Sequence, residues 1–162
     1  MKEENMLIFS LAFIINFLTW GVYITIRDVK EKVIPNKYVG FFILSSVCIS
    51  LIPHHQRTAG HYLGYGIMAG LFFFLIFLVL RLISRGRIGM GDVKLAFPLG
   101  INIGITQPDG FEAALLFIFL GAGIAAIVMK IRGRSISDAI AFAPFMFMGS
   151  ALSIGLMFAS KS

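Results

Sequence analysis

Long runs of apolar residues that carry no charge constrain this chain more than any other feature. The longest runs exceed the roughly 18 residues that mark a transmembrane helix. Backbone N–H and C=O groups in hydrocarbon must pair within their own segment, so such runs are helices. The sequence therefore predicts an all-α polytopic membrane protein, a single domain over residues 1–162 that forms a bundle of six transmembrane helices. The predicted spans are 6–26, 38–52, 62–83, 93–105, 111–129 and 139–159.

The basic residues predict how the bundle is oriented. The stretches that follow the first, third and fifth spans, taken with the residues on their flanks, hold four, four and three of the fourteen lysines and arginines. Because such residues gather on the cytoplasmic side, these stretches are predicted to be cytoplasmic and both termini to lie outside, in the cytoplasmic (inner) membrane. The net charge of +6 does not indicate nucleic-acid binding, because the chain has no solvated basic domain to hold a phosphate backbone. The lipid bilayer is the expected partner.

Two aspartates are predicted to lie at the cytoplasmic face. Asp28 directly follows the first span and Asp92 precedes the fourth, so both lie on the same side of the membrane. Two carboxylates that meet share a proton, which separates their pKa values and leaves one acid and one base to activate water. Asp92 near a helix N-terminus would be favoured as the anion, with Asp28 as the proton carrier. The alternative, that both merely mark helix ends, stays open on chemistry alone.

The spans that follow the two aspartates are predicted to be short. Fifteen and thirteen residues cover roughly 20–23 Å, against a hydrocarbon core near 30 Å. We therefore expect a water-filled notch at their cytoplasmic ends. Gly89 and Gly91 flank this position and allow close backbone approach or positive φ beside Asp92.

Three segments resemble a known family. Gly89-Met90-Gly91-Asp92 fits the glycine-x-glycine-aspartate motif of intramembrane aspartyl proteases. Asp28 with Ile34-Pro35-Asn36 narrows the resemblance to the type IV prepilin peptidases, in the short six-span form of the tight-adherence pilus systems. Phe142-Ala143-Pro144-Phe145 is similar to the family's Pro-Phe-Gly-Pro segment, although Ala141 and Ala143 stand in place of its first proline and its glycine.

The resemblance implies an aspartic endopeptidase with Asp28 and Asp92 as the catalytic pair. Its substrate would be a type IV prepilin or pseudopilin, whose short basic leader is cut on the cytoplasmic side without a metal or organic cofactor. Lys94 also matches the motif and would tune the pair or orient the substrate, unless it only snorkels to the interface. Full-length relatives carry an insertion with paired cysteines that is associated with N-methylation. This chain has a single cysteine, so we expect no N-methyltransferase activity.

The matching motif residues are expected to support the site. They are Gly89, Gly91, Lys94, Pro35, Asn36 and Pro144.

Two other functions fit a bundle with acidic residues. One is a small proton- or cation-coupled transporter that uses the two aspartates as ion sites, although such sites are expected near mid-membrane with access from both sides. The other is a catalytically inactive assembly subunit. A homo-oligomer also stays open, because Gly66 and Gly70 have the spacing of a helix-contact motif that serves either packing within the bundle or a dimer.

Some smaller signals are not assigned chemistry. His54, His55 and His61 gather in one predicted outer loop, where exposed loop polarity is a better account than a metal site. Pro108-Asp109-Gly110 predicts a turn. Ser135 and Asp138 have the spacing of a helix-capping box.

Overall fold

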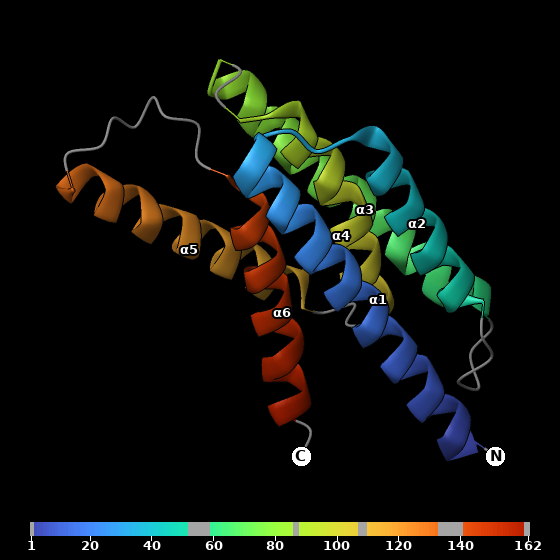
Figure 1. Cartoon of the computed structure of the whole chain (residues 1–162). Helices are drawn as coiled ribbons and strands as arrows, with labels where there is room; N and C mark the ends of the chain where they lie inside the picture. The colour runs from blue at the N-terminus through green and yellow to red at the C-terminus, as the bar shows by residue number, and fades with distance from the viewer. Residues whose placement is uncertain (1, 52–58, 86–87, 107–109, 133–140, 161–162) are drawn as a thin grey trace.

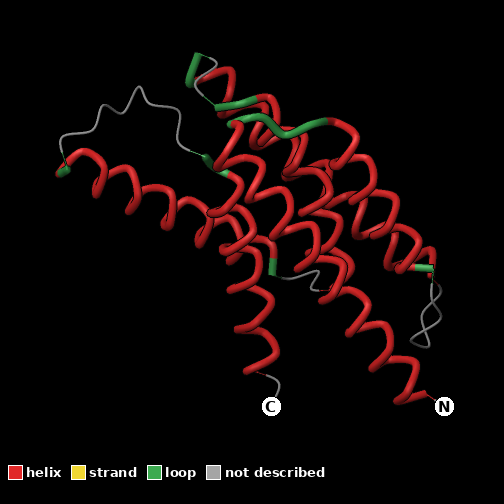
Figure 2. Tube along the Cα trace, in the orientation of Figure 1, coloured by secondary structure: helices red, strands yellow, loops and turns green. Residues whose placement is uncertain are grey.

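The helices of this computed structural model match the predicted all-α architecture. The structure describes residues 2–51, 59–85, 88–106, 110–132 and 141–160, and within them the chain forms six α-helices and no strand (Figures 1 and 2). The helices are α1 Lys2–Glu31, α2 Asn36–Ser50, α3 Ala59–Ile83, α4 Met90–Thr106, α5 Phe111–Ile131 and α6 Ala143–Ser160. His54, His55, Ser135, Asp138 and the turn at 108–109 lie outside the described residues. His61 lies in α3.

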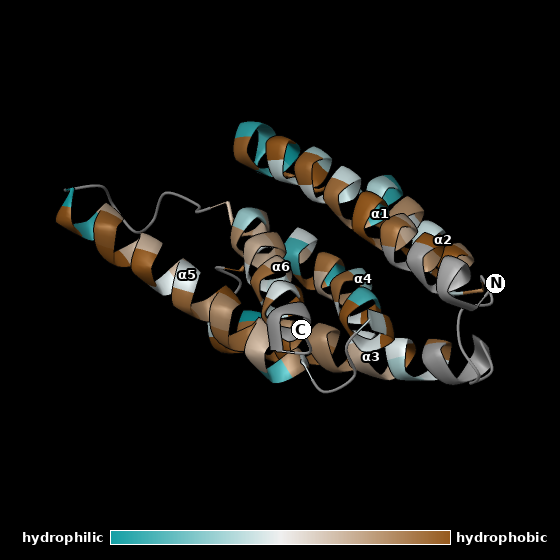
Figure 3. Ribbon diagram, turned by 90° about the horizontal axis from the view of Figure 1, so that it is seen from below, coloured by the Kyte–Doolittle hydropathy of each residue, from teal (hydrophilic) through white to brown (hydrophobic). Residues whose placement is uncertain are grey.

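Three segments of these helices are long and apolar enough to cross a membrane. They are Leu11–Glu31, Leu63–Ile83 and Phe111–Ile131. Hydrophilic residues gather at the C-terminal ends of α1 and α5, while most of each helix is apolar (Figure 3). The chain is therefore an integral, all-α membrane protein. The shorter α2, of 15 residues, and α4, of 17 residues, span roughly 23 Å and 26 Å.

The first helix is longer than predicted, which changes the position of Asp28. α1 continues past residue 26 to Glu31, so Asp28 lies in its last turn and not in a following loop. An i,i+4 ion pair between Arg27 and Glu31 stabilises this extension. The helix ends at Lys32, whose backbone N–H donates to the Asp28 carbonyl oxygen at 2.9 Å and whose φ is 52°. The extension thus carries the aspartate on a regular helix.

α4 lies at the centre of the bundle and packs tightly on α3. It is buried along nearly its whole length and contacts α2, α3, α5 and α6. A Cβ on Gly100 would lie 2.6 Å from the Ala69 carbonyl oxygen, and one on Gly104 would lie 2.6 Å from that of Tyr65. On α3, a Cβ on Gly66 would lie 2.7 Å from the Ile105 side chain. The helix-contact motif of α3 therefore serves packing inside the bundle.

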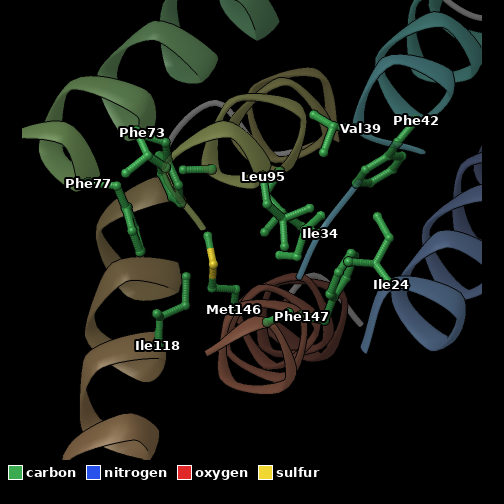
Figure 4. Close-up of a cluster of buried hydrophobic side chains, with 14 of the residues drawn as sticks. Ile24, Ile34, Val39, Phe42, Phe73, Phe77, Leu95, Ile118, Met146 and Phe147 are labelled. Atoms are coloured by element: carbon green, nitrogen blue, oxygen red, sulfur yellow. The ribbon is translucent and has the colours of Figure 1, made fainter. Parts of the chain in front are cut away.

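An apolar core joins α4 to the helices around it. Leu95 of α4 lies beside Ile34 of the α1–α2 loop, whereas Met146 of α6 points toward Phe73 and Ile118 (Figure 4). Phe42 and Phe147 close the cluster beside α1. A polar contact lies deeper in the bundle. There Asn16 of α1 and Asn102 of α4 both donate to the Ser46 hydroxyl oxygen, at 3.2 Å and 2.9 Å. These contacts fix the register of α1, α2 and α4.

Candidate active site

The two aspartates lie at the same end of the bundle, 64 positions apart in the sequence. Asp28 is in the last turn of α1 and is 6% exposed, whereas Asp92 is in the first turn of α4 and is 8% exposed. The C-terminal end of α1 and the N-terminal ends of α4 and α6 face the same way (Figure 1). Buried carboxylates are costly unless they are hydrogen-bonded or neutral. Each of these two carboxylates must therefore be hydrogen-bonded or neutral.

Asp28 is held by the N-terminus of α6. The backbone N–H of Ala143, the first residue of that helix, donates to Asp28 Oδ2 at 2.9 Å. The N–H of Phe142 also bonds this carboxylate. Both donors favour the charged form, as does the positive end of the α6 dipole. These donors therefore offset part of the cost of burying the Asp28 carboxylate as an anion.

Asp92 sits beside the two motif glycines. A Cβ on Gly89 would lie 3.1 Å from Asp92 Oδ2, and one on Gly91 would lie 3.0 Å from the Ile34 Cβ. Neither glycine has the positive φ that the sequence left open, so close approach is the reason for glycine here. The guanidinium of Arg81 donates to the Ile88 carbonyl oxygen, which ties the segment just before Gly89 to α3.

The electrostatics of the pair favour Asp92 as the residue that holds a proton. This residue precedes the predicted fourth span by one position. Burial, and then the nearby charge of Asp28, raise its pKa from 3.8 to about 7, although the Gly89 backbone N–H acts in the opposite direction. This raised pKa favours Asp92 as the proton carrier, whereas the sequence favoured Asp28. The N-terminus of α6, which lies 115 positions from Asp28 in the sequence, stabilises the Asp28 anion.

The remaining motif residues are a hydrogen-bonded pair, Lys94 and Asn36, and two prolines at helix starts. Lys94 Nζ donates to Asn36 Oδ1 at 2.9 Å, so these two matching positions meet across α4 and α2. Pro35 is the N-cap of α2, with extended backbone at φ −65° and ψ 134°. Pro144 is the second residue of α6, where proline is tolerated because it does not interrupt a helix interior. It therefore shapes the helix start that bonds Asp28 and does not kink the helix.

One functional contact could not be found from the residue types. The donors to Asp28 are backbone N–H groups of Phe142 and Ala143, and no side-chain chemistry marks them. The only available signal is the resemblance of the 142–145 segment to a family motif. Phe142 itself packs in an aromatic cluster with Phe77 and Phe119, with ring centroids 5.8 Å and 6.4 Å away, which holds the start of α6 in place.

Comparisons with known proteins show to which family the chain is related. Residues 15–131 match the model of the type IV leader peptidase family. The chain is also similar to the prepilin leader peptidase/N-methyltransferase of Bacillus subtilis (strain 168), with 28% identity over 138 residues. That alignment covers 84% of this chain and 52% of the relative, so the chain spans about half the length of this relative. No solved structure matches significantly.

Proposed function

This chain belongs to the type IV leader peptidase family, and from that premise we propose that it is an intramembrane aspartyl endopeptidase. Its substrates would be type IV prepilins or pseudopilins, whose short basic leader it removes at the cytoplasmic face of the inner membrane. Both termini would lie on the outer side. One observation carries the proposal: two buried aspartates from distant parts of the sequence lie within electrostatic reach of each other at one end of the bundle.

The proposed mechanism uses the two protonation states that the site favours. The Asp28 carboxylate takes a proton from a water molecule as the water oxygen attacks the scissile carbonyl carbon. Neutral Asp92 gives its proton to the carbonyl oxygen, which forms a tetrahedral diol. The diol then collapses, the C–N bond breaks, and the leaving amine takes the proton that Asp28 holds. Diol collapse returns a proton to Asp92, so the pair ends as it began.

The supporting residues have proposed roles that follow from their contacts. Gly89 and Gly91 let Asp92 and Ile34 approach the helix start, and Pro144 shapes the α6 N-terminus that holds Asp28. Lys94 and Asn36 act as a pair outside the aspartate site. The Bacillus subtilis relative is named as an N-methyltransferase as well. We propose that this chain lacks that second activity, because its single cysteine cannot supply the paired cysteines associated with it.

The test is leader removal in cells that co-express the chain with candidate prepilins. Cleavage is followed by gel shift and N-terminal sequencing, with each variant shown to be present in the membrane at the normal amount. Asp28→Asn and Asp92→Asn are each expected to lower the cleavage rate by roughly 10²–10⁴-fold, the range for loss of a general acid or base. Glu112→Gln is the matched control, since it neutralises an exposed carboxylate in the first turn of α5, at the opposite end of the bundle. Cleavage that persists in either aspartate variant would refute the aspartyl mechanism.

A further inference from the structure

A groove opens between α2, α3 and α4. Its volume is about 480 Å³. The apolar walls come from three helices: Val39, Gly40 and Ile43 of α2, Leu71 and Phe74 of α3, and Phe97 of α4. The groove exists because α2 packs mainly against α1 and α4 and touches α3 only sparsely. Gly40 widens it further, since no described atom lies within 4 Å of the position that a Cβ would take.

One end of this groove is polar and positively charged. Asn36 and Lys94 are its two polar lining residues, and Lys94 Nζ donates to Asn36 Oδ1 at 2.9 Å. An ammonium group has three N–H donors, and this contact uses one of them. Lys37 follows Asn36 in the first turn of α2 and is exposed, which adds a second positive charge near the same end. The groove therefore combines a cationic rim with an apolar channel.

The direction of the groove matches that of a lipid in the bilayer. From Asn36 to Ile43 the wall follows α2 for seven residues, about 10 Å along the helix axis. Both Asn36 and Lys94 lie near the helix ends that face the cytoplasm in the proposed orientation. A phosphate would thus lie at the level of the lysine and an acyl chain would run along the apolar wall. Basic pockets between helices on the cytoplasmic side bind anionic headgroups in this way.

A transmembrane segment of the substrate fits the groove less well. Asp92 and Lys94 are two positions apart on one helix, which separates their directions by about 200°. A peptide whose scissile bond lies at the aspartates would therefore have to pass around α4 to reach the groove. An acyl chain is narrower than a helix and fits.

We propose that this groove between α2, α3 and α4 binds an anionic phospholipid, with its phosphate on Lys94 and one acyl chain between Gly40 and Phe97. The site lies on the opposite side of α4 from the aspartates and does not depend on the peptidase function. Its occupant bridges α2 and α3, which otherwise touch only sparsely.

The test is native mass spectrometry of the intact chain, released from detergent micelles that contain a single added lipid. We expect wild type to retain phosphatidylglycerol in preference to phosphatidylcholine. Lys94→Gln should reduce that preference about five-fold, the factor for one lysine at an anionic surface. Gly40→Leu should remove the bound lipid, because its side chain fills the groove. Gly123→Leu is the matched control, since Gly123 of α5 is exposed and likewise has no described atom within 4 Å of a Cβ position. It should bind lipid as wild type does.

Several results would overturn the proposal. Equal retention of the two lipids by wild type would remove the anionic preference. Lipid binding by Gly40→Leu at the wild-type level would show that the groove is not the lipid site. If that variant instead kept its lipid but bound a membrane-inserted prepilin more weakly, a protein segment would be the occupant. Circular dichroism of each variant verifies that the helices are intact.

Discussion

The α3–α4 contact and the aspartate site both rely on glycine, but a side chain would displace different things in the two regions. On Gly100 a Cβ would lie 2.6 Å from a backbone carbonyl oxygen and 2.7 Å from the Gly70 Cα, neither of which can move without separating the helices. On Gly89 it would lie 3.1 Å from a carboxylate oxygen, and on Gly91 it would lie 3.0 Å from the Ile34 side chain. Glycines of the first kind maintain the fold, whereas Gly89 leaves room for the Asp92 carboxylate and Gly91 leaves room for Ile34.

The largest expected effect comes from breaking the α3–α4 contact. Gly100→Leu should lower the free energy of unfolding by about 3 kcal/mol or more, because the new side chain must push apart two helix backbones. Reversible unfolding in mixed micelles, followed by circular dichroism, measures this loss. Gly64→Leu is the control, because Gly64 is an exposed glycine of α3 with no described atom within 4 Å of its Cβ position. Equal stability of the two variants would contradict the comparison.

A substitution at Gly91 is expected to affect cleavage activity more than stability. Gly91→Ala should slow leader cleavage by roughly 10-fold or more, since displacement of a reactive group by a fraction of an ångström is costly in rate. Its unfolding free energy should fall by only about 1 kcal/mol, because Ile34 lies in a loop and can shift. Combination with Ile34→Ala makes room for the new methyl group. Recovery of part of the rate in the double variant would show that the two positions are coupled.

The pH dependence of cleavage should reflect the aspartate pair. Asp92 keeps its proton up to about pH 7, so the rate is expected to fall as pH rises through that value. The same group affects stability. Its folded-state pKa lies above the ordinary value of 3.8, so its contribution is complete below about pH 4 and is lost as pH rises through about 7. Asp92→Asn should remove this part of the pH dependence of unfolding, while Gly64→Leu should retain it.

The sequence predicts the helices well because their signal is local. Uninterrupted apolar runs define each span, and the basic stretches separate the two sides of the bundle. The predicted end of the first helix was wrong because the polar stretch Arg27-Asp28-Val29-Lys30-Glu31 is typical of a loop. No residue in this stretch breaks a helix. The first strong break is Pro35, and the Arg27–Glu31 pair supports the extra turn. Local polarity therefore predicted a loop where the backbone is helical.

The candidate site could be predicted only as far as its residue types. Asp28 and Asp92 stand out as acids at one face, and Gly89 and Gly91 mark close approach. The proton assignment could not be predicted, because it depends on which helix start faces Asp28. That partner is Ala143, whose N–H belongs to the backbone and carries no sequence signal. Contacts of this kind follow from packing, and a single sequence does not reveal them.

The most direct test of the aspartate pair is a carboxyl titration by ¹³C NMR of the chain labelled at aspartate, in bicelles. We expect Asp92 to titrate near pH 7 in wild type. In Asp28→Asn the neighbouring charge is gone while burial and the Gly89 N–H remain, so the pKa of Asp92 should fall below 7. A pKa of Asp92 that is the same in both proteins would mean that the two carboxyls do not sense each other. That result would contradict the paired site on which the proposed mechanism rests.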